Sequence, residues 1–244
     1  MLIQGEVGSL DPVPPYLYHS IILIMEVIER GDVLMKHPFR LMCAGASGTG
    51  KTTFVAKMLK NIKKMVDVGF DKIIFSYSQE QELYDQIKEN NPDIIWVEGY
   101  DRNTDETYLS DKSQNKLIVF DDQMETLSNN LDFQTFFTKK SHHLNISVIF
   151  LVQNIYYKSK YMRTINLNTT AYAIFKSPRD MSQVYLLSRQ LYPGSSHFMI
   201  DSYKDATSHP FGYLIVDIDP RTLDKFRLRS SILPDDTLVV YRER

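Results

Sequence analysis

The sequence has 244 residues, is 43% hydrophobic and 24% charged, and contains 28 Lys and Arg against 30 Asp and Glu. This composition is typical of a globular protein with a sizeable core, and it excludes an intrinsically disordered or low-complexity chain. The net charge of −2 gives no overall attraction to nucleic acid, and the single cysteine, Cys43, excludes a disulfide framework and a cysteine-based zinc site.

The start of the chain differs from the rest. Residues 1–15 are rich in Gly, Pro and Asp and are expected to form an irregular arm, and Tyr16–Arg30 is expected to form a helix. The apolar run Ile21–Ile28 is too short to span a bilayer, which needs about 20 residues, and no secretory leader is recognised. We therefore expect a soluble intracellular protein with no membrane partner, in which an N-terminal arm (1–35) precedes one domain (36–244).

From residue 36 onward, predicted strands and helices alternate. Short apolar runs predict strands, and apolar residues at helical spacing predict amphipathic helices. Because the strands are nearly all apolar, they indicate an α/β fold with a mostly parallel sheet covered on both faces. A polar, acidic loop is predicted over 98–115. The predicted strands are Phe39–Ala44, Lys72–Tyr77, Asp93–Val97, Lys116–Phe120, Ser147–Val152, Ala171–Phe175, Tyr213–Asp217 and Thr237–Tyr241, and the predicted helices are Lys51–Val66, Gln79–Glu89, Leu131–Thr138 and one from Ser177–Asp180 to about Leu191.

Residues 45–52, between the first of these strands and the first helix, fit the phosphate-binding pattern G-x-x-x-x-G-K-[ST] at every fixed position. Glycines let the backbone curl so that successive N–H groups point at phosphate oxygens, and the following helix adds the positive end of its dipole. Lys51 is expected to reach the β- and γ-phosphates, and the Thr52 hydroxyl to ligate Mg²⁺. The alternative is a merely flexible Gly/Ser turn. The residues predicted to bind ATP are Gly45, Ala46, Ser47, Gly48, Thr49, Gly50, Lys51, Thr52 and Thr53.

Two acids, Asp121 and Asp122, follow the apolar strand that begins at Lys116. The first acid at the carboxyl end of such a strand is placed to hold the Mg²⁺ shell, and the second to polarise an attacking water. Acids are also common turn residues, so a structural role stays open.

The apolar strand Ser147–Val152 ends in the amide Gln153. If this strand lies beside the one that carries Asp121, Gln153 faces the γ-phosphate and the lytic water, and it reports the nucleotide state to the basic loop that follows. The alternative is a polar residue that simply closes a strand.

No Asp or Glu occurs from Phe133 to Arg179, a window that carries a net charge of +7. A basic surface without carboxylates suits contact with phosphates. The alternative is a set of solvated basic residues between buried strands. The basic residues are Lys139, Lys140, Lys158, Lys160, Arg163, Lys176 and Arg179.

The motifs belong to a longer series of segments: GASGTGKTT (45–53), KLIVFDD (116–122), TKKSHHLNISVIFLVQN (138–154), RTINLN (163–168), FKSPRD (175–180), DAT (205–207) and GYLIVDIDP (212–220). Over roughly residues 36–230, this series resembles the genome-packaging ATPases of the FtsK–HerA superfamily, in particular the viral branch of poxvirus-like, Polinton-type and related double-stranded DNA viruses. The run from Ser141 through Asp180 is the part most specific to that branch.

The resemblance implies a RecA-like P-loop core, a homo-oligomeric ring (pentamer or hexamer) and ATP-driven translocation of double-stranded DNA into a preformed capsid. It implies ATP and Mg²⁺ as cofactors, the Mg²⁺ and water-activating roles for Asp121 and Asp122, and the sensor role for Gln153. A capsid or portal component is a further expected partner. The protein is expected inside an infected host cell, in cytoplasm or nucleus, or associated with the virion.

A neighbouring subunit of such a ring usually supplies an arginine that stabilises charge on the γ-phosphate. Arg163 is the first candidate here and Arg179 the second. Several relatives carry arginine near Lys139 or Lys140, and lysine lacks the planar fork of arginine. Many superfamily members also have glutamate where this chain has Asp122.

Two other functions stay open: a small P-loop kinase acting on a nucleoside or metabolite, and a nucleotide-gated DNA-binding module. A kinase needs an arginine-rich lid and an acceptor pocket, which the acid-free window does not resemble. The adjacent His142 and His143 cannot easily share one metal ion, so packing or phosphate contact is expected. The segment Tyr156–Tyr161 is either a pore loop that grips DNA or a solvated loop.

Overall fold

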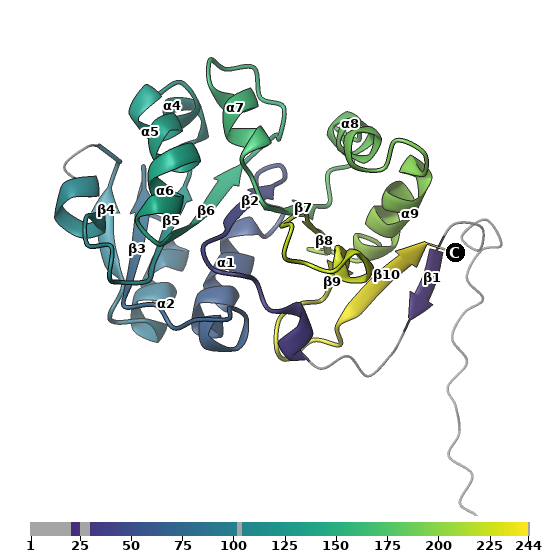
Figure 1. The fold of residues 1–244 in the computed structure, drawn as a ribbon, viewed down its shortest axis with the longest axis horizontal. Coiled ribbons are helices and arrows are strands. Elements are labelled where there is room, and N and C mark those ends of the chain that lie inside the picture. The colour runs from purple at the N-terminus through teal and green to yellow at the C-terminus, as the bar shows by residue number, and fades with distance from the viewer. Residues whose placement is uncertain (1–20, 25–29, 102–103, 244) are drawn as a thin grey trace, which may run out of the picture.

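The structure, a computed structural model, describes residues 21–24, 30–101 and 104–243. Within these ranges ten strands form one sheet in the order β1-β10-β9-β8-β7-β2-β6-β5-β3-β4 (Figure 1). The strands are β1 (Ile21–Ile24), β2 (Arg40–Ala44), β3 (Lys72–Tyr77), β4 (Ile95–Glu98), β5 (Lys116–Asp121), β6 (Ile146–Val152), β7 (Ala171–Phe175), β8 (Tyr213–Asp217), β9 (Leu228–Ser230) and β10 (Val239–Glu243). The α-helices are α1 (Lys51–Lys60), α2 (Glu82–Asn90), α4 (Met124–Ser128), α5 (Leu131–Thr135), α6 (Ser141–His143), α7 (Met162–Leu167), α8 (Ser182–Leu191) and α9 (Ser196–Ala206).

The sheet has a parallel half and an antiparallel half. Strands β4, β3, β5, β6, β2 and β7 run in one direction, whereas each pairing from β7 through β8, β9 and β10 to β1 is antiparallel. The predicted α/β P-loop fold with a largely parallel central sheet is confirmed. Because parallel strands end at the same edge, the loops after β2, β5, β6 and β7 gather there.

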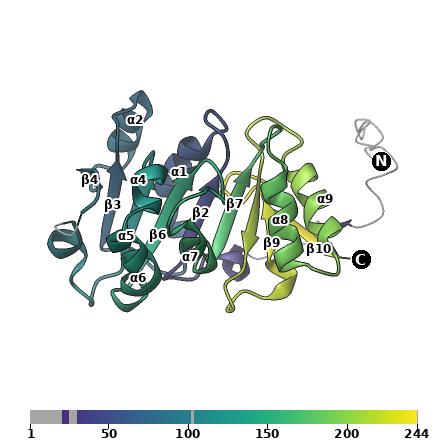
Figure 2. The same cartoon turned by 90° about the horizontal axis from the view of Figure 1, so that it is seen from above.

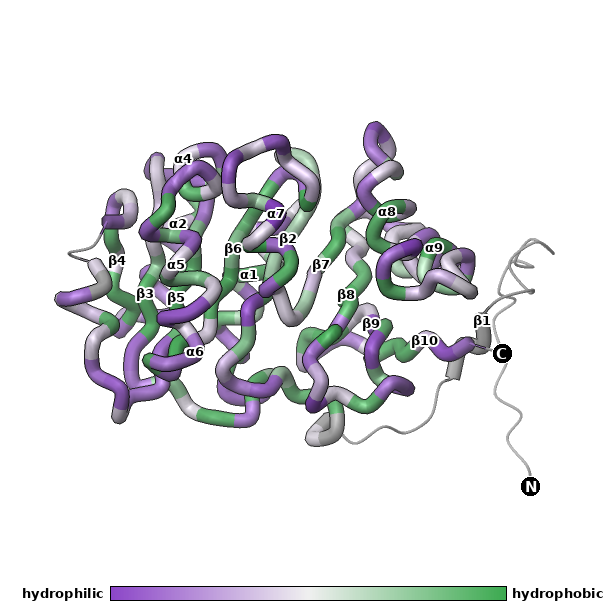
Figure 3. Tube along the Cα trace, turned by 45° about the horizontal axis from the view of Figure 1, so that its top comes forward, coloured by the Kyte–Doolittle hydropathy of each residue, from purple (hydrophilic) through white to green (hydrophobic). Residues whose placement is uncertain are grey.

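Two hydrophobic cores cover the two faces of the sheet. On one face, α1 and α2 bury residues such as Phe54 and Met58 against alternate residues of β2, including Leu41 and Cys43. On the other face, α5 and α7–α9 pack on the intervening residues, among them Met42. Figure 2 shows these two helical layers on opposite sides of the sheet, and Figure 3 shows hydrophobic residues concentrated in the central strands β2 and β6. Every residue of β5 and β6 is buried, as expected of strands covered twice.

The helix predicted over Tyr16–Arg30 is wrong where the structure describes that segment. Ile21–Ile24 form β1, which pairs antiparallel with β10, and the remaining residues up to 29 lie outside the described ranges. Three β-branched isoleucines suit a pleated strand better than a helix, and β10 offers an edge for pairing.

The other predicted elements are confirmed with changed ends. The first helix ends at Lys60, six residues before the predicted end at Val66. A 3-10 turn, η3 (Ile62–Lys64), follows it and buries Ile62. A helical segment continues from α5 through η5 (Phe136–Lys140) into α6, beyond the predicted end at Thr138. Within 98–115, the turn η4 (Asp105–Leu109) buries Leu109 in the core. The remaining short turns are η2 (Arg30–Val33) and η6 (Asp224–Phe226).

Candidate nucleotide site

The phosphate-binding loop connects β2 to α1 at the carboxyl edge of the parallel strands. Gly45 extends the sheet by donating its N–H to Val152 O at the end of β6 (3.2 Å). Gly48 and Gly50 have φ of 78° and 93°, which side-chain-bearing residues rarely adopt. Gly50 is the residue before α1, so the curled loop leads directly into the N-terminus of that helix. This strand–loop–helix geometry is the context that the motif requires for phosphate binding.

Lys51 points back into its own loop. Its Nζ donates to Gly45 O (2.7 Å) and Ala46 O (3.0 Å). Burial lowers the pKa of Lys51, whereas the nearby Asp121 opposes that shift. The loop therefore holds a partly desolvated cation against its own backbone carbonyls.

Asp121, the last residue of β5, is 4% exposed. Its Oδ2 accepts hydrogen bonds from Thr52 Oγ1 (3.0 Å) and from the Tyr84 hydroxyl (3.1 Å). Burial raises the pKa of Asp121, and the hydrogen bonds from Thr52 and Tyr84 and the charge of Lys51 act in the opposite direction. A carboxylate and a hydroxyl in contact are the hard oxygen ligands that suit Mg²⁺, which commonly uses one or two carboxylates and takes further ligands from phosphate and water. The two residues predicted to hold the metal therefore fit that ion.

Asp122 adopts a left-handed conformation (φ 55°) that turns its exposed side chain away from the core. Ser78, which follows β3, donates its hydroxyl to Asp122 O (2.6 Å) and lies 3.3 Å from Oδ2. The next residue, Gln123, is buried and donates to Ser76 Oγ in β3 (2.7 Å). The turn after β5 is thus held on β3, with one carboxylate directed inward and the next exposed.

Gln153 follows β6, which pairs with both β5 and β2, so the expected adjacency to the Asp121 strand is confirmed. Its side chain is exposed, and its N–H donates to Met124 Sδ (3.3 Å) at the start of α4. Since Val152 contacts Gly45, Gln153 lies between the phosphate loop and the turn that carries the two acids.

The turn after Gln153 is bonded to the start of α8. Asn154 Nδ2 donates to Asp180 Oδ2 (2.5 Å), and the Ile155 N–H donates to Gln183 Oε1 (3.2 Å). Asp180 also accepts from the backbone of Ser182 (3.2 Å) at the first residue of α8. These contacts form one polar unit, here called the β6–α8 latch: Asn154, Ile155, Asp180, Ser182 and Gln183.

The basic window is divided between the two ends of the sheet. Lys139 and Lys140 lie in η5, whose chain leads through α6 to the beginning of β6, so they are near the edge opposite the phosphate loop. The remaining basic residues of the window follow the carboxyl ends of β6 and β7. Arg163, at the start of α7, and Arg179, in the loop before α8, are exposed and have no ion-pair partner among the described residues. The basic residues of this window therefore do not form one continuous face from Lys139 to Arg163.

Three residues near the site carry no prediction from the sequence: Ser78, Tyr84 and Phe211. Ser78 had a usable signal, because it is a polar residue that follows a strand ending at the same edge. Tyr84 looks like an ordinary apolar-face residue of a helix, and its hydroxyl meets Asp121 only after folding. Phe211 is one aromatic residue in a loop, and it is taken up below.

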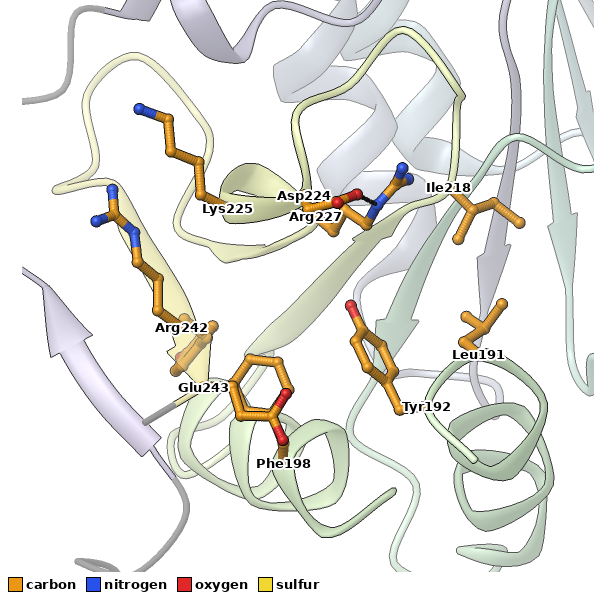
Figure 4. Close-up of a pocket in the computed structure, with 10 residues that line it drawn as sticks. Leu191, Tyr192, Phe198, Ile218, Asp224, Lys225, Arg227, Arg242 and Glu243 are labelled. Atoms are coloured by element: carbon orange, nitrogen blue, oxygen red, sulfur yellow. Dashed lines mark hydrogen bonds and ion pairs between the residues drawn. The ribbon is translucent and has the colours of Figure 1, made fainter. Parts of the chain in front are cut away.

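The hollow shown in Figure 4, about 690 Å³, lies elsewhere. It is lined by the end of α8, Phe198 of α9, and β10, and its rim carries the Asp224–Arg227 ion pair (2.8 Å). The Tyr192 hydroxyl points toward that rim. This hollow belongs to the antiparallel half of the sheet and shares no residue with the phosphate loop. Across the described ranges, no group of three or more His, Cys, Asp or Glu side chains is arranged to hold a metal ion, and no helix is both long and apolar enough to cross a membrane.

Comparison with known proteins matches the chain to a protein family. The family model described as "Poxvirus A32 protein" matches residues 27–172, more than half of the chain. No curated protein sequence matches.

Solved structures of packaging ATPases share the fold. The DNA-packaging ATPase B204 from Sulfolobus Turreted Icosahedral Virus has 13% identity and a TM-score of 0.50, over 75% of this chain and 94% of that one. The genome packaging NTPase B204 from Sulfolobus turreted icosahedral virus 2 is similar in its complex with AMPPCP (13% identity, TM-score 0.50, 74% and 92% covered). Its complex with sulfate is similar as well (12% identity, TM-score 0.51, 85% and 98% covered). At these identities the likeness concerns the fold.

Proposed function

Because the chain belongs to the poxvirus A32 protein family and is an ATPase of the genome-packaging type, we propose that it hydrolyses ATP at the β2–α1 loop and uses the energy to translocate double-stranded viral DNA into a capsid. The relationship to FtsK–HerA packaging ATPases expected from the sequence is confirmed by this membership. The observation that carries the proposal is the convergence of Lys51, the Thr52–Asp121 contact and Asp122 at one edge of the sheet.

In this proposal the loop N–H groups from Gly45 to Thr53 and the N-terminus of α1 hold the triphosphate. Lys51 exchanges its contacts with Gly45 O and Ala46 O for the β- and γ-phosphates. Thr52 and Asp121 hold Mg²⁺, which when bound neutralises charge that develops on the phosphates.

Asp122 is the residue that orients and deprotonates the attacking water. Its exposed carboxylate lies next to the metal-binding residue, and Ser78 fixes its backbone. A general base of this kind has to lie within hydrogen-bond reach of the water. The left-handed conformation of Asp122 directs its carboxylate out of the core, where such a water can approach it. Gln153 is the sensor, because its position between the loop and the acids gives it access to the γ-phosphate.

The remaining parts of the proposal concern partners. Lys158, Lys160 and Lys176 follow strands at the nucleotide edge and supply positive charge for the DNA backbone. A homo-oligomeric ring brings Arg163 or Arg179 of a neighbouring subunit to the γ-phosphate. Both guanidinium groups are exposed, as a group that acts across an interface has to be. A capsid or portal component receives the DNA, and the reaction takes place inside an infected cell.

ATP turnover measured with and without duplex DNA tests the proposal. We expect DNA to stimulate turnover, with no phosphorylated acceptor formed. The variant Asp122→Asn should keep ATP affinity while kcat falls about a hundredfold or more, since a positioned general base contributes roughly that much. Turnover that is indifferent to DNA would contradict the motor. Phosphate transfer to a nucleoside or metabolite would support a kinase, and an Asp122→Asn variant with unchanged slow turnover would support a nucleotide-gated binding module.

A further inference from the structure

A small hollow, about 160 Å³, opens beside the phosphate loop on the side away from Asp121. Gly50 and Thr53 belong both to the loop and to the wall of this hollow. The strand order β5-β6-β2-β7-β8 puts Asp121 and Gln153 on one side of the loop and the hollow, next to β7 and β8, on the other. A triphosphate whose terminal phosphate faces Asp121 therefore extends its opposite end toward the hollow.

The floor of the hollow is rigid and apolar. Phe54, Phe175 and Tyr213 form a trio of rings with centroids 4.7–5.7 Å apart, and Leu233 completes the wall. The Tyr213 hydroxyl accepts the N–H of Ile232 (3.1 Å). The polar groups around the hollow are those of Thr53 and Lys57, which lie on exposed positions of α1. This surface offers flat apolar contact rather than a pattern of hydrogen-bonding groups.

Phe211 stands at the mouth of the hollow and is 66% exposed. A Cβ placed on Gly50 would lie 3.1 Å from Phe211 Cδ1, so the ring rests directly against the loop. Phe211 is unfavourable in two ways, because its apolar ring is exposed to water and its φ of 62° strains the backbone. Strained residues of this kind concentrate at ligand sites. Because the Phe211 ring is mostly exposed, little hydrophobic burial offsets this backbone strain.

The loop that carries Phe211 is closed by a tight turn and bonded to the residue after β7. The Gly212 N–H donates to His209 O (3.2 Å), and Lys176 N–H donates to Gly212 O (3.3 Å). A Cβ at Gly212 would lie 2.4 Å from Ala206 O, so the turn fits only glycine. The backbone therefore presents the Phe211 ring at a fixed place beside the phosphate loop.

We propose that this hollow receives the nucleobase of the triphosphate, and that the base stacks on Phe211 and is held by ring contact rather than by its hydrogen-bonding edge. The proposal rests on the proposed function, since it needs the phosphates in the β2–α1 loop. A binding site that does not pair with the base edge discriminates weakly between bases, so ATP and GTP should bind within about tenfold of each other.

Calorimetric titration with Mg²⁺ and three probes, ATP, GTP and inorganic tripolyphosphate, tests this. Tripolyphosphate has no base and reports the phosphate loop alone. The variant Phe211→Ala should weaken ATP and GTP binding roughly 5- to 150-fold, the range that base–aromatic stacking gives, while tripolyphosphate affinity stays unchanged. Phe211→Tyr keeps the ring and should restore ATP affinity. Tyr185→Ala, which truncates another exposed aromatic residue on α8, is the matched control and should change nothing.

Each other outcome has a distinct meaning. Unchanged ATP affinity in Phe211→Ala, or an equal loss for ATP and tripolyphosphate, overturns the base site and leaves the phosphate loop standing. A preference of wild type for one purine above about a hundredfold also overturns recognition by stacking alone. Wild-type protein that binds none of the three probes contradicts the proposed function itself.

Discussion

Asp121 is held by two donors that serve different purposes. The Thr52 hydroxyl belongs to the phosphate loop and joins Asp121 as a metal ligand in the proposal above. The Tyr84 hydroxyl comes from α2 and is buried in an aromatic cluster with Phe75 and Trp96, so it is fixed in place. A buried carboxylate whose pKa is raised depends on such donors to stay ionised. Tyr84 therefore supports the negative charge that a cation needs.

The pH dependence of kcat/KM should reflect this arrangement. Because burial raises the pKa of Asp121, protonation competes with Mg²⁺ at a higher pH than at an ordinary aspartate, and activity falls as pH drops through that raised value. Tyr84→Phe removes one opposing hydrogen bond, so the acid limb should move to still higher pH and the Mg²⁺ requirement should rise about tenfold. The measurement is kcat/KM against pH at several Mg²⁺ concentrations.

Tyr77→Phe is the control for that experiment. Tyr77 lies in the same aromatic cluster, 5.5 Å from the Tyr84 ring, but its hydroxyl contacts Glu80 rather than Asp121. It should leave the acid limb in place. A limb that does not move in Tyr84→Phe, with lowered thermal stability alone, would mean that Tyr84 only packs.

At this scale the sequence predicts where the motif residues lie, but it does not reveal the residues that support them. Gly45–Thr53, Asp121 and Gln153 were predictable, because each sits at a strand end where local pattern and chemistry coincide. Tyr84 and Phe211 reach the site through contacts between segments far apart in the chain, which one sequence does not reveal. The roles of Arg163 and Arg179 stay predictions, since a partner across an interface lies outside a single chain.

Strands β8 and β9 are joined by a buried ion pair. Arg229 is 2% exposed and its Nη2 donates to Asp217 Oδ2 at 2.7 Å. Burial lowers the pKa of Arg229, and Asp217 opposes that shift. The pair sits where β8 ends and leads to the segment that returns as β9, so it ties together two short strands of the antiparallel half.

Asp217→Ala should lower the free energy of unfolding by about 3–5 kcal/mol, because it leaves a buried guanidinium without its counter-charge. Asp224→Ala removes an ion pair with Arg227 in which the Asp224 side chain is 93% exposed, and it should cost at most about 1 kcal/mol. Urea unfolding of both variants beside wild type measures the difference. Equal effects in the two would show that the Arg229–Asp217 pair adds no more than a surface contact.

The elements that were predictable are those with a strong local pattern. β5, β6 and β7 are continuous apolar runs, because each is covered on both faces. β9 has three residues and includes Arg229, so it lacks such a run, and β1 is defined only by its pairing with β10. The short helices α4 and α7 give too few turns for a period to show. α9 was missed although Pro193, Gly194 and Ser195 just before it are a usable start signal.

At the scale of the whole molecule, the parallel half carries the phosphate loop and the two acids, and the antiparallel half extends the sheet beyond β7. The described residues place no arginine in an ion pair with Asp121 or Asp122. Under the ring proposal, the site is completed only by a second copy of the chain. An isolated subunit is then expected to hydrolyse ATP feebly.

Mixing two inactive variants tests this directly. Asp122→Asn lacks the general base, and Arg163→Ala lacks the first candidate arginine. In a mixed ring some interfaces combine an intact Asp122 with an intact Arg163, so ATP turnover should exceed the sum of the two variants measured apart. Arg179→Ala is mixed in the same way for the second candidate, and Arg189→Ala, an exposed arginine on α8, should stay active alone. Turnover of the mixtures equal to that sum would exclude sharing of the site by these residues.

The β6–α8 latch limits how the turn after β6 can rearrange. If Asn154 and Ile155 shift while α8 remains in place, their hydrogen bonds to Asp180 and Gln183 break, and a hydrogen bond typically contributes roughly 1 kcal/mol, more where a charged group takes part. If the hydrogen bonds persist, the ten-residue helix α8 moves with the turn, together with its exposed residues Tyr185 and Leu186. Intact latch contacts would therefore couple a backbone displacement at the end of β6, next to the proposed position of the γ-phosphate, to motion of an outer surface.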